Sequence, residues 1–271
     1  MDQSSERGEV FAPERQDRIA RIVDERGRAR VAELAAMFDV SAVTIRKDLL
    51  ALETTGRLIR AHGGAIASDR NRPESAFEIR ERLQPREKEL IGAAAAAMVV
   101  DGESIALDAS TTALALARHL KARGTWANLT VVTNGLRIAS ELAGHAGITV
   151  AIPGGFVRWE ALSVVGPLGA GLFERINVQK AFMGAAGFSI ENGLSDATDE
   201  EAQIKRLMVG TAREVIAVVD HTKWQRAAFA TFCRTQQLTA VVCDDQSPPE
   251  MLGRLRELGI DVRIATGDPK P

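Results

Sequence analysis

The sequence predicts an α/β protein in two parts: a small helical domain that ends in a β-hairpin, and a larger domain of alternating strands and helices. Three observations lead to this. Residues 31–64 carry apolar side chains at helical spacing and then a short basic, glycine-containing segment. Residues 68–85 are charged and contain two prolines, as linkers often do, and the residues from 86 onward alternate strand and helix patterns. Such a division is usual for 271 residues. We therefore expect a polar, frayed tail over 1–12, a small domain over 13–67, a linker with a short helix over 68–85, and a large domain over 86–271.

The small domain is predicted to contain three helices. Arg15–Asp24 and Val31–Phe38 repeat apolar residues every three or four positions, which indicates amphipathic helices. Residues 39–41 break this pattern. Ser41 is a suitable N-cap for a third helix, because its side chain can accept a hydrogen bond from a free backbone N–H near Thr44.

The third helix has two faces of different character. Its apolar stripe consists of Ile45, Leu49 and Leu52. The outer face consists of Ala42, Val43, Arg46 and Lys47, with Thr44 at its flank. An outward cationic face that begins at a helix N-terminus suits insertion into the major groove of DNA. Gly56 should end the helix, Arg57–Arg60 should form a wing strand, and His62 should lie near its tip, where cations can contact phosphates. The predicted DNA-contacting residues are Ser41, Val43, Thr44, Arg46, Lys47, Arg57, Arg60 and His62.

The charge of the chain is distributed unevenly. The whole chain has a net charge of −2, yet the segment from Arg26 to Gly63 holds seven arginine and lysine residues against four acidic ones. This is the local footprint expected of a nucleic-acid-binding surface, and counter-ion release then predicts strongly salt-dependent binding. A dimer or tetramer would multiply the basic surface. The alternative is a small three-helix domain with a solvated basic face.

The large domain is predicted to be a mostly parallel sheet with helices on both faces. Short apolar runs indicate strands at 104–107, 129–132, 148–152, 180–184, 215–219, 229–232, 239–243 and 261–264. Helical spacing indicates helices at 87–99, 112–121, 136–143, 166–173, 198–212 and 249–258.

Polar loops follow four of these strands: Asp108–Thr112, Thr133–Gly135, Pro153–Arg158 and Asp220–Lys223. In an open α/β sheet, the loops at the carboxyl ends of the strands line the ligand crevice. Four polar loops should therefore converge on one edge of one sheet, and this convergence predicts a small-molecule site.

The residue types in these loops suit an anionic, hydroxylated ligand. Ser110, Thr111 and Thr112 offer hydroxyl groups and backbone N–H groups at a helix N-terminus, where phosphate binds well, although plain helix capping would explain them too. Gly154 and Gly155 allow close approach of the backbone to a ligand, or simply serve a turn that needs positive φ.

Charged and amide side chains complete the candidate site. Arg158 can pair with phosphate in a bidentate manner, and Lys223 can supply a point charge, although both residue types are often merely solvated. Asp108 and Asn134 can bind sugar hydroxyls, while Asp108 can equally brace a neighbouring loop. Glu201 and Lys205 stand four residues apart on one helix, where they form either a helix-supporting ion pair or a group that orients hydroxyls.

The segment VSAVTIRKDLLALETTGRLIRAHGGA resembles the signature of the DeoR family of bacterial transcription regulators. The segments LDASTT, VVTN, PGGFVR, SVVGPL, KAFMGAAG, EEAQIKRLM and VVDHTKW resemble that family's C-terminal sensor domain. The resemblance covers Arg15 to about Asp244. It implies a winged helix-turn-helix domain followed by an α/β domain similar to ribose-phosphate isomerases, glucosamine-phosphate deaminases and CoA transferases.

The resemblance also implies a function. Such regulators bind phosphorylated sugars or related metabolites, and repression relieved by ligand is their usual logic. By position, the implied effector-binding residues are Asp108, Ser110, Thr111, Thr112, Asn134, Gly154, Gly155, Arg158, Glu201, Lys205, Asp220 and Lys223. Two departures stand out. Ala42 and Val43 occupy positions where the family often has larger polar residues or Met, and Ala186 occupies a position that is acidic or an amide in many relatives.

Two functions follow from these patterns. The first is a repressor of a carbohydrate-metabolism operon whose large domain senses a phosphorylated sugar. The second is a sugar-phosphate isomerase or deaminase with an added DNA-binding module. Proton transfer needs a positioned base; Asp108, Glu201 or Asp220 could serve, but Ala186 removes one candidate and His221 lacks a clear partner. We favour the regulator and assign no catalytic residue.

Other features of the sequence limit which kinds of protein this can be. Cys233 and Cys243 are expected to be free, buried thiols in a reducing cytoplasm. The histidines are scattered, so no metal site and no cofactor is predicted; they are His62, His119, His145 and His221. There is no apolar run long enough for a membrane span and no secretory signal. The expected assembly is a cytoplasmic homo-oligomer, a dimer or tetramer, bound to a double-stranded DNA operator.

Overall fold

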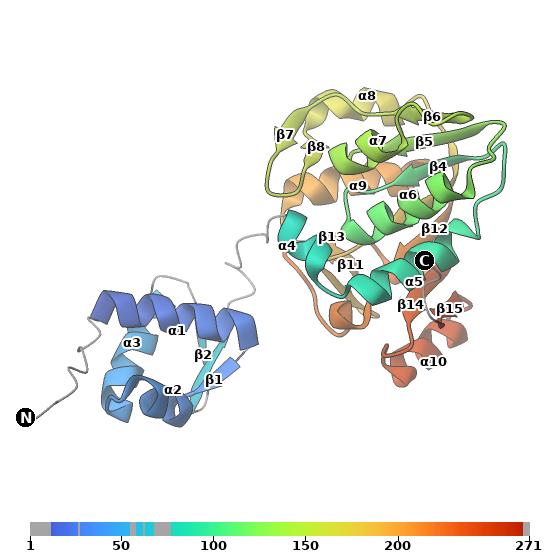
Figure 1. Ribbon diagram of the computed structural model, residues 1–271. Helices are drawn as coiled ribbons and strands as arrows, with labels where there is room; N and C mark the ends of the chain where they lie inside the picture. Colours follow the sequence, from blue (N-terminus) through green and yellow to red (C-terminus); the bar gives the residue numbers. More distant parts are fainter. Residues whose placement is uncertain (1–11, 27, 55–57, 62, 68–76, 268–271) are drawn as a thin grey trace, which may run out of the picture. The chain divides into compact units, whose positions relative to one another are not determined.

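A computed structural model describes residues 12–26, 28–54, 58–61, 63–67 and 77–267 (Figure 1). The chain divides into two compact units, Met1–Pro73 and Glu74–Pro271, and each is described by itself. Within the described residues, no helix combines the length and the apolar character that a membrane span requires.

The small unit packs three helices against a three-stranded antiparallel sheet of order β1-β3-β2. Its elements are α1 (Ala12–Arg26), β1 (Arg28–Arg30), α2 (Val31–Phe38), α3 (Ala42–Thr54), β2 (Leu58–Ala61) and β3 (Gly64–Ala67). The core is formed mainly by Ile19, Val23, Leu34, Ile45, Leu49, Leu52 and Leu58. The three predicted helices and the wing are confirmed, whereas β1 was not expected.

The turn between α2 and α3 is set by two polar residues. Asp39 has a left-handed φ of 53° and ends α2, a conformation that aspartate adopts more readily than most residues. The Oγ atom of Ser41 accepts a hydrogen bond from the N–H of Thr44 at 3.1 Å. Ser41 thus caps α3 as predicted, which fixes where the helix begins.

The large unit is built on a seven-stranded sheet in which every adjacent pair is parallel. The strand order is β15-β14-β12-β9-β4-β5-β6. These strands are β4 (Ser104–Leu107), β5 (Leu129–Thr133), β6 (Ile148–Ala151), β9 (Val178–Met183), β12 (Ala212–Val218), β14 (Ala240–Asp244) and β15 (Asp261–Ala265). The parallel sheet of the sequence analysis is therefore confirmed.

Helices cover both faces of this sheet (Figure 1). One core cluster lies under α5 (Pro85–Ala96), α6 (Thr111–Arg123) and α7 (Leu136–Leu142). The other lies under α8 (Ala170–Phe173), α9 (Asp199–Thr211) and α10 (Pro249–Glu257). Because the central strands are buried on both sides, they read as continuous apolar runs rather than as alternating patterns.

Two small antiparallel sheets were not predicted. Strand β7 (Phe156–Arg158) pairs with β8 (Ser163–Val165), and β10 (Gly187–Ser189), β11 (Gly193–Asp196) and β13 (Ala230–Cys233) form a second sheet. Each strand is only three or four residues long, so sequence periodicity gives little signal. The strand expected at 229–232 is β13, but it belongs to an antiparallel sheet and not to the parallel one. Both sheets border the site described below.

Helix α4 (Phe77–Arg82) is the short helix expected between the domains, and it packs onto the large unit. The Nζ atom of Lys88 lies 2.5 Å from the carbonyl oxygens of both Arg80 and Leu83. Lys88 therefore caps the C-terminal end of α4. Burial lowers the pKa of this lysine to about 8, more than the nearby Asp220 carboxylate can offset.

Candidate functional site

The outer face of α3 is exposed and cationic. Arg46 and Lys47 are exposed, and Val43 is 59% exposed, whereas Ile45 and Leu49 are completely buried. The hydroxyls of Ser41 and Thr44 lie 2.9 Å apart at the start of this face. The side chains predicted to read DNA from α3 therefore share one accessible surface.

A buried ion pair fixes the rotation of α3 about its axis. Asp48 is 3% exposed and accepts hydrogen bonds from the Nε atom of Arg15 at 2.6 Å and from the Nε2 atom of Gln16 at 3.0 Å. Both donors lie on α1. Because Asp48 is held inward, the neighbouring Arg46 and Lys47 are held outward.

The wing contributes one described cation. Arg60 lies on β2, where its N–H donates to Glu53 Oε1 at 3.2 Å and its guanidinium pairs with Glu53 at 3.6 Å. This contact ties the wing to the end of α3. Arg57 and His62, which were also predicted to contact phosphate, lie outside the described residues.

In the large unit, the predicted loops do lie at the carboxyl edge of the sheet. Asp108 directly follows β4, Asn134 follows β5, Pro153 lies beyond β6 and Asp220 lies beyond β12. Strands β4, β5 and β6 are neighbours in the sheet, and Gly184, which was not predicted, follows β9 on the other side of β4. Asp108 and Asn134 are both completely buried.

Lys205 on α9 is the centre of the first cluster. Its Nζ atom lies 2.6 Å from Asp108 Oδ2 and 2.5 Å from Asp196 Oδ2, and it donates to the carbonyl of Gly184 at 3.1 Å. Burial by itself disfavours the ammonium form, but the two carboxylates together outweigh it, so the pKa of Lys205 lies above its usual value. Lys205 is therefore a fixed positive charge between two acids.

Glu201, one turn earlier on α9, is the centre of a second set of contacts. Its Oε1 atom accepts from Arg158 Nη1 at 3.0 Å and from the Ser163 hydroxyl, and its Oε2 atom accepts from Asn134 Nδ2 at 3.5 Å. Arg158 also donates to Thr198 at 3.1 Å. Burial raises the pKa of Glu201, although Lys205, Ser163 and Arg158 act against the shift.

Two buried oxygen atoms of this site lack a hydrogen-bond partner among the described residues: Oδ1 of Asp108 and Oδ1 of Asn134. Buried polar atoms are almost always satisfied by protein, water or ligand. Two acceptors on adjacent strands suit the hydroxyl groups of a bound molecule.

The start of α6 is a capped helix N-terminus. Ser110 is the N-cap, and its Oγ atom accepts from the N–H of Ala113 at 3.1 Å. Gly184 packs so closely that an added Cβ would lie 2.4 Å from this oxygen. The capping alternative thus accounts for the Ser110 side chain. Thr111 and Thr112 are buried, and their N–H groups belong to the first turn, which lacks intrahelical acceptors.

The two glycines before β7 have different surroundings. Gly155 has a φ of 147°, and an added Cβ would lie 2.3 Å from the carbonyl oxygen of Val165, so the hairpin itself requires glycine there. A Cβ on Gly154 would meet only Leu168 O at 3.7 Å, an ordinary contact. The turn alternative is sufficient for Gly155.

Asp220 and Lys223 belong to a separate cluster beyond β12, which is separated from β4 by β9. Asp220 accepts from the N–H of Thr222 at 2.9 Å and lies 4.0 Å from Lys223 Nζ. The neighbouring His221 pairs with Asp244 at 3.1 Å. The structure therefore divides the predicted effector residues into a main cluster around Glu201 and Lys205 and this second cluster.

Three side chains of the main cluster were not predicted from the sequence: Ser163, Asp196 and Thr198. Ser163 and Asp196 lie on short strands of the unexpected hairpins. Thr198 is the N-cap of α9 and accepts from the N–H of Glu201 at 3.4 Å. A capping threonine three residues before Glu201 was a signal that could have been used.

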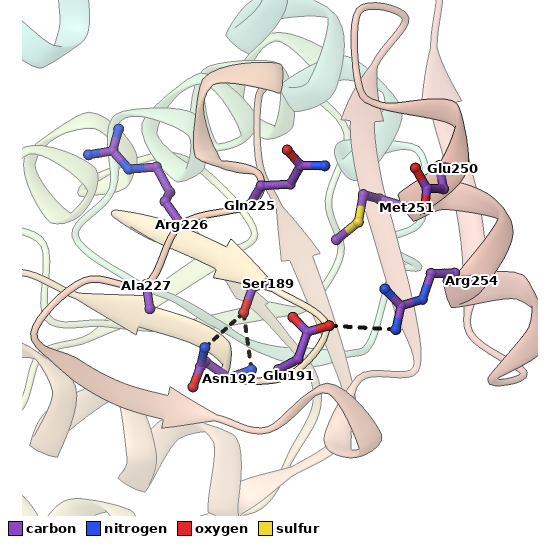
Figure 2. Close-up of a pocket in the computed structure, with 9 residues that line it drawn as sticks. All are labelled: Ser189, Glu191, Asn192, Gln225, Arg226, Ala227, Glu250, Met251 and Arg254. Carbon is purple, nitrogen blue, oxygen red and sulfur yellow. Dashed lines mark hydrogen bonds and ion pairs between the residues drawn. The ribbon is translucent and has the colours of Figure 1, made fainter. Parts of the chain in front are cut away.

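A separate groove of about 340 Å³ lies between the β10–β11 hairpin, the loop after His221–Lys223 and α10 (Figure 2). Its polar groups bind one another: Ser189 Oγ accepts twice from Asn192 at 3.1 Å, and Arg254 pairs with Glu191 at 3.5 Å. None of the predicted site residues lines it. In the described part of the chain, no cluster of three or more His, Cys, Asp or Glu could hold a metal ion.

Comparison with known proteins gives matches over both units. Residues 15–71 match the DeoR-like helix-turn-helix domain, and residues 83–245 match the DeoR C-terminal sensor domain. The HTH-type transcriptional regulator GolR of Listeria innocua is 36% identical over 94% of this chain and 100% of its own length. A putative aga operon transcriptional repressor of Escherichia coli O157:H7 is 29% identical over 96% of this chain and 97% of its own length.

Among solved structures, ribose 5-phosphate isomerase A of Neisseria gonorrhoeae matches with 13% identity and a TM-score of 0.38. The match covers 51% of this chain and 52% of that one.

Proposed function

The chain belongs to the DeoR family of transcription regulators, and we propose that it is a repressor of a carbohydrate operon controlled by a phosphorylated sugar. The observation that carries the effector assignment is the pair of unsatisfied buried acceptors, Asp108 Oδ1 and Asn134 Oδ1. Asp108 also pairs with the Lys205 ammonium and lies two residues before the N-cap of α6, and Asn134 donates to Glu201. We expect the protein to act in the cytoplasm, because its DNA partner lies there.

The DNA-reading surface is the outer face of α3. Arg46 and Lys47 supply donors for base edges or phosphates in the major groove, and Ser41 and Thr44 supply hydroxyls at the helix N-terminus. Val43 can make only apolar contact, for example with a thymine methyl group. Arg60, Arg57 and His62 of the wing segment would contact phosphates and so fix orientation rather than sequence.

We expect the sugar part of the effector to lie against the acidic and amide side chains of the main cluster. Asp108 and Asn134 accept hydrogen bonds from the sugar hydroxyls. Glu201 holds the side chain of Asn134 in place, and Lys205 holds that of Asp108. The phosphate needs positive potential, which the first turn of α6 at Thr111 and Thr112 supplies through backbone N–H groups. Arg158 and, from the second cluster, Lys223 can add charge-assisted contacts. Ser110, Gly154, Gly155 and Asp220 shape the surrounding loops.

The contacts of the acidic side chains in the main cluster argue against the isomerase or deaminase alternative. A general base must be free to take a proton from the substrate. Asp108 and Asp196 are both paired with Lys205, and Glu201 is engaged by Arg158 and Ser163. Ala186 supplies no acid at its position. We infer that the large unit recognises its sugar phosphate without converting it.

Control of DNA binding follows from linkage. An oligomer presents two or more α3 helices to repeated operator half-sites. An effector shifts such an equilibrium only through its different affinity for the two forms, typically by about 1–3 kcal/mol. Arg158 is the residue best placed to transmit effector binding to the rest of the large unit, because it joins strand β7 to Glu201 and Thr198.

Thermal unfolding of the purified chain against a panel of sugar phosphates tests the effector assignment. A ligand that binds only the native state raises the unfolding temperature in a concentration-dependent way. We expect one or a few sugar phosphates to do so, and the matching free sugars and inorganic phosphate to do so much less. An equal shift with inorganic phosphate alone would contradict recognition of the sugar, and turnover of any panel member would restore the enzyme alternative.

A further inference from the structure

The β7–β8 hairpin carries an unusual concentration of exposed apolar side chains. Exposed fractions are 65% for Phe156, 48% for Val157 and 74% for Trp159, with Leu168 at 70% just beyond the hairpin. These four residues are called the hairpin patch below. Isolated exposed apolar residues are common, but several together on one short segment mark an interaction surface.

The backbone of the hairpin is open as well. Within the described residues, β7 pairs with β8 and with no other strand, and the two strands form a sheet of their own at the rim of the large unit (Figure 1). Successive residues of a strand point to opposite faces, so the exposure of both Phe156 and Val157 leaves both faces of β7 uncovered. An open strand edge of this kind is a template for pairing with another strand.

Charge indicates which partner the hairpin patch fits. Between residues 151 and 169 the chain contains only two charged side chains, Arg158 and Glu160. Arg158 is turned to Glu201 and Thr198, so residues 151–169 themselves offer no cluster of cations to nucleic acid or anionic lipid. A surface that meets its own copy across a two-fold axis must carry few like charges, and the exposed charge of this segment is limited to Glu160.

We propose that the hairpin patch is a self-association surface, on which β7 of one chain pairs antiparallel with β7 of a second copy. Antiparallel pairing of a strand with itself has two-fold symmetry and closes, so one patch suffices on each chain. The edge of β7 supplies main-chain hydrogen bonds, and Phe156, Trp159 and Leu168 supply the apolar area.

Both strands of the hairpin are also hydrogen-bonded to residues of the main cluster. Arg158 on β7 and the Ser163 hydroxyl on β8 both bind Oε1 of Glu201. In addition, the N–H of Val164 donates to the carbonyl of Asn134 at 2.7 Å. Because coupling between two sites is reciprocal, a ligand that engages Arg158 or Asn134 would alter association, and association would alter its affinity. The self-association itself does not depend on which ligand binds.

Sedimentation velocity of the full chain over a concentration series, with no DNA and no sugar phosphate, tests the proposal. The variant combines Phe156→Glu and Trp159→Glu. The matched control is Phe229→Glu, since Phe229 is 73% exposed on the same unit but outside the patch. We expect the dissociation constant to rise at least about 30-fold in the double variant, as for loss of an interface hot spot, and to be unchanged in the control. Unaltered thermal unfolding shows that both variants fold.

Cysteine cross-linking tests the geometry directly. Cys233 and Cys243 are buried, and burial raises the pKa of their thiols to about 12 and about 11, so neither reacts readily. We expect Val157→Cys to form a disulfide-linked dimer under mild oxidation, and the control Val100→Cys, at a residue 59% exposed, not to do so. A native chain that stays monomeric at all concentrations, or a double variant that associates like the native chain, would overturn the proposal.

Discussion

The Nζ atom of Lys205 lies 2.6 Å from Oδ2 of Asp108, and both side chains are buried at the carboxyl edge of the sheet. This ion pair joins helix α9 to the end of β4, and the second carboxylate, Asp196, joins the same lysine to β11. These contacts of Lys205 thus fix the position of the side chains to which the effector is proposed to bind.

Lys205→Met should destabilise the large unit severely, because it leaves two buried carboxylates without their common partner. Removal of one member of a buried ion pair costs about 3–5 kcal/mol. Urea unfolding measures the effect. Lys223→Met, which removes a partly exposed lysine 4.0 Å from Asp220, should cost less than about 1 kcal/mol. Equal stability of the Lys205 variant and the native chain would mean that the Lys205 contacts are not formed.

Combining Lys205→Met with Asp108→Asn and Asp196→Asn should recover part of the lost stability. The three changes remove the uncompensated charges together, and neutral buried groups cost much less than unpaired carboxylates. The same unfolding measurement gives the coupling. Strict additivity of the separate losses would show that these residues do not interact.

Arg46→Ala and Lys47→Ala should each weaken operator binding by about 1–3 kcal/mol if the lost contact is to a base edge. A lost phosphate contact should instead reduce the slope of log affinity against log salt by about one. Fluorescence anisotropy with a labelled duplex over a range of salt concentrations separates the two cases. Arg18→Ala is the matched control, since Arg18 is an exposed arginine of α1 paired with Glu14. Unchanged binding after both α3 substitutions would contradict the placement of this helix in the groove.

Arg158→Ala should leave DNA affinity intact but abolish the response to effector, because Arg158 contacts both Glu201 and Thr198 from strand β7. The measurement is operator affinity at increasing sugar-phosphate concentration. Arg206→Ala provides the comparison, since Arg206 lies on the same helix as Glu201 but pairs with exposed Asp199. A normal dose–response in the Arg158 variant would remove this residue from the site.

The stability contributed by Lys88 should increase as the pH rises. Its pKa is lowered to about 8 in the folded chain, from 10.5 for an unperturbed lysine. Between these values the unfolded state binds more protons than the folded state, so raising the pH favours folding. Relative to Lys88→Met, the native chain should therefore gain stability from about pH 8 to 10.5 and show a constant difference below this window. A difference that falls with pH would mean that the folded chain holds this proton more tightly, not less.

Sequence patterns were sufficient for the elements that follow from local chemistry. The Ser41 cap, the stripe of α3 and the long apolar strands each depend on a few neighbouring residues, and each lies where it was predicted. The strand-end argument led to Asp108 and Asn134, because strand ends of a parallel sheet meet at one edge. Glu201 and Lys205 were singled out instead by their spacing on one helix and by the family resemblance.

The remainder depended on contacts between distant residues. Ser163 and Asp196 reach the main cluster on strands of three and four residues, too short to show periodicity. Ser163 is 38 residues from its partner Glu201, and Asp196 meets Lys205 only because β11 and α9 fold against each other. The separation of Asp220 and Lys223 from the main cluster likewise follows from strand order, which the sequence alone did not determine.

The most direct test of the division of labour between the two units is one titration of the full chain. A duplex selected by the purified protein from a random pool is titrated with and without the sugar phosphate that gives the largest thermal shift, and the reaction mixture is assayed for conversion of the sugar phosphate. We predict tight, salt-dependent binding that the effector changes by about 5–150-fold, with the sugar phosphate recovered unchanged. No selected duplex, or sustained conversion of the sugar phosphate without any change in DNA affinity, would contradict the account.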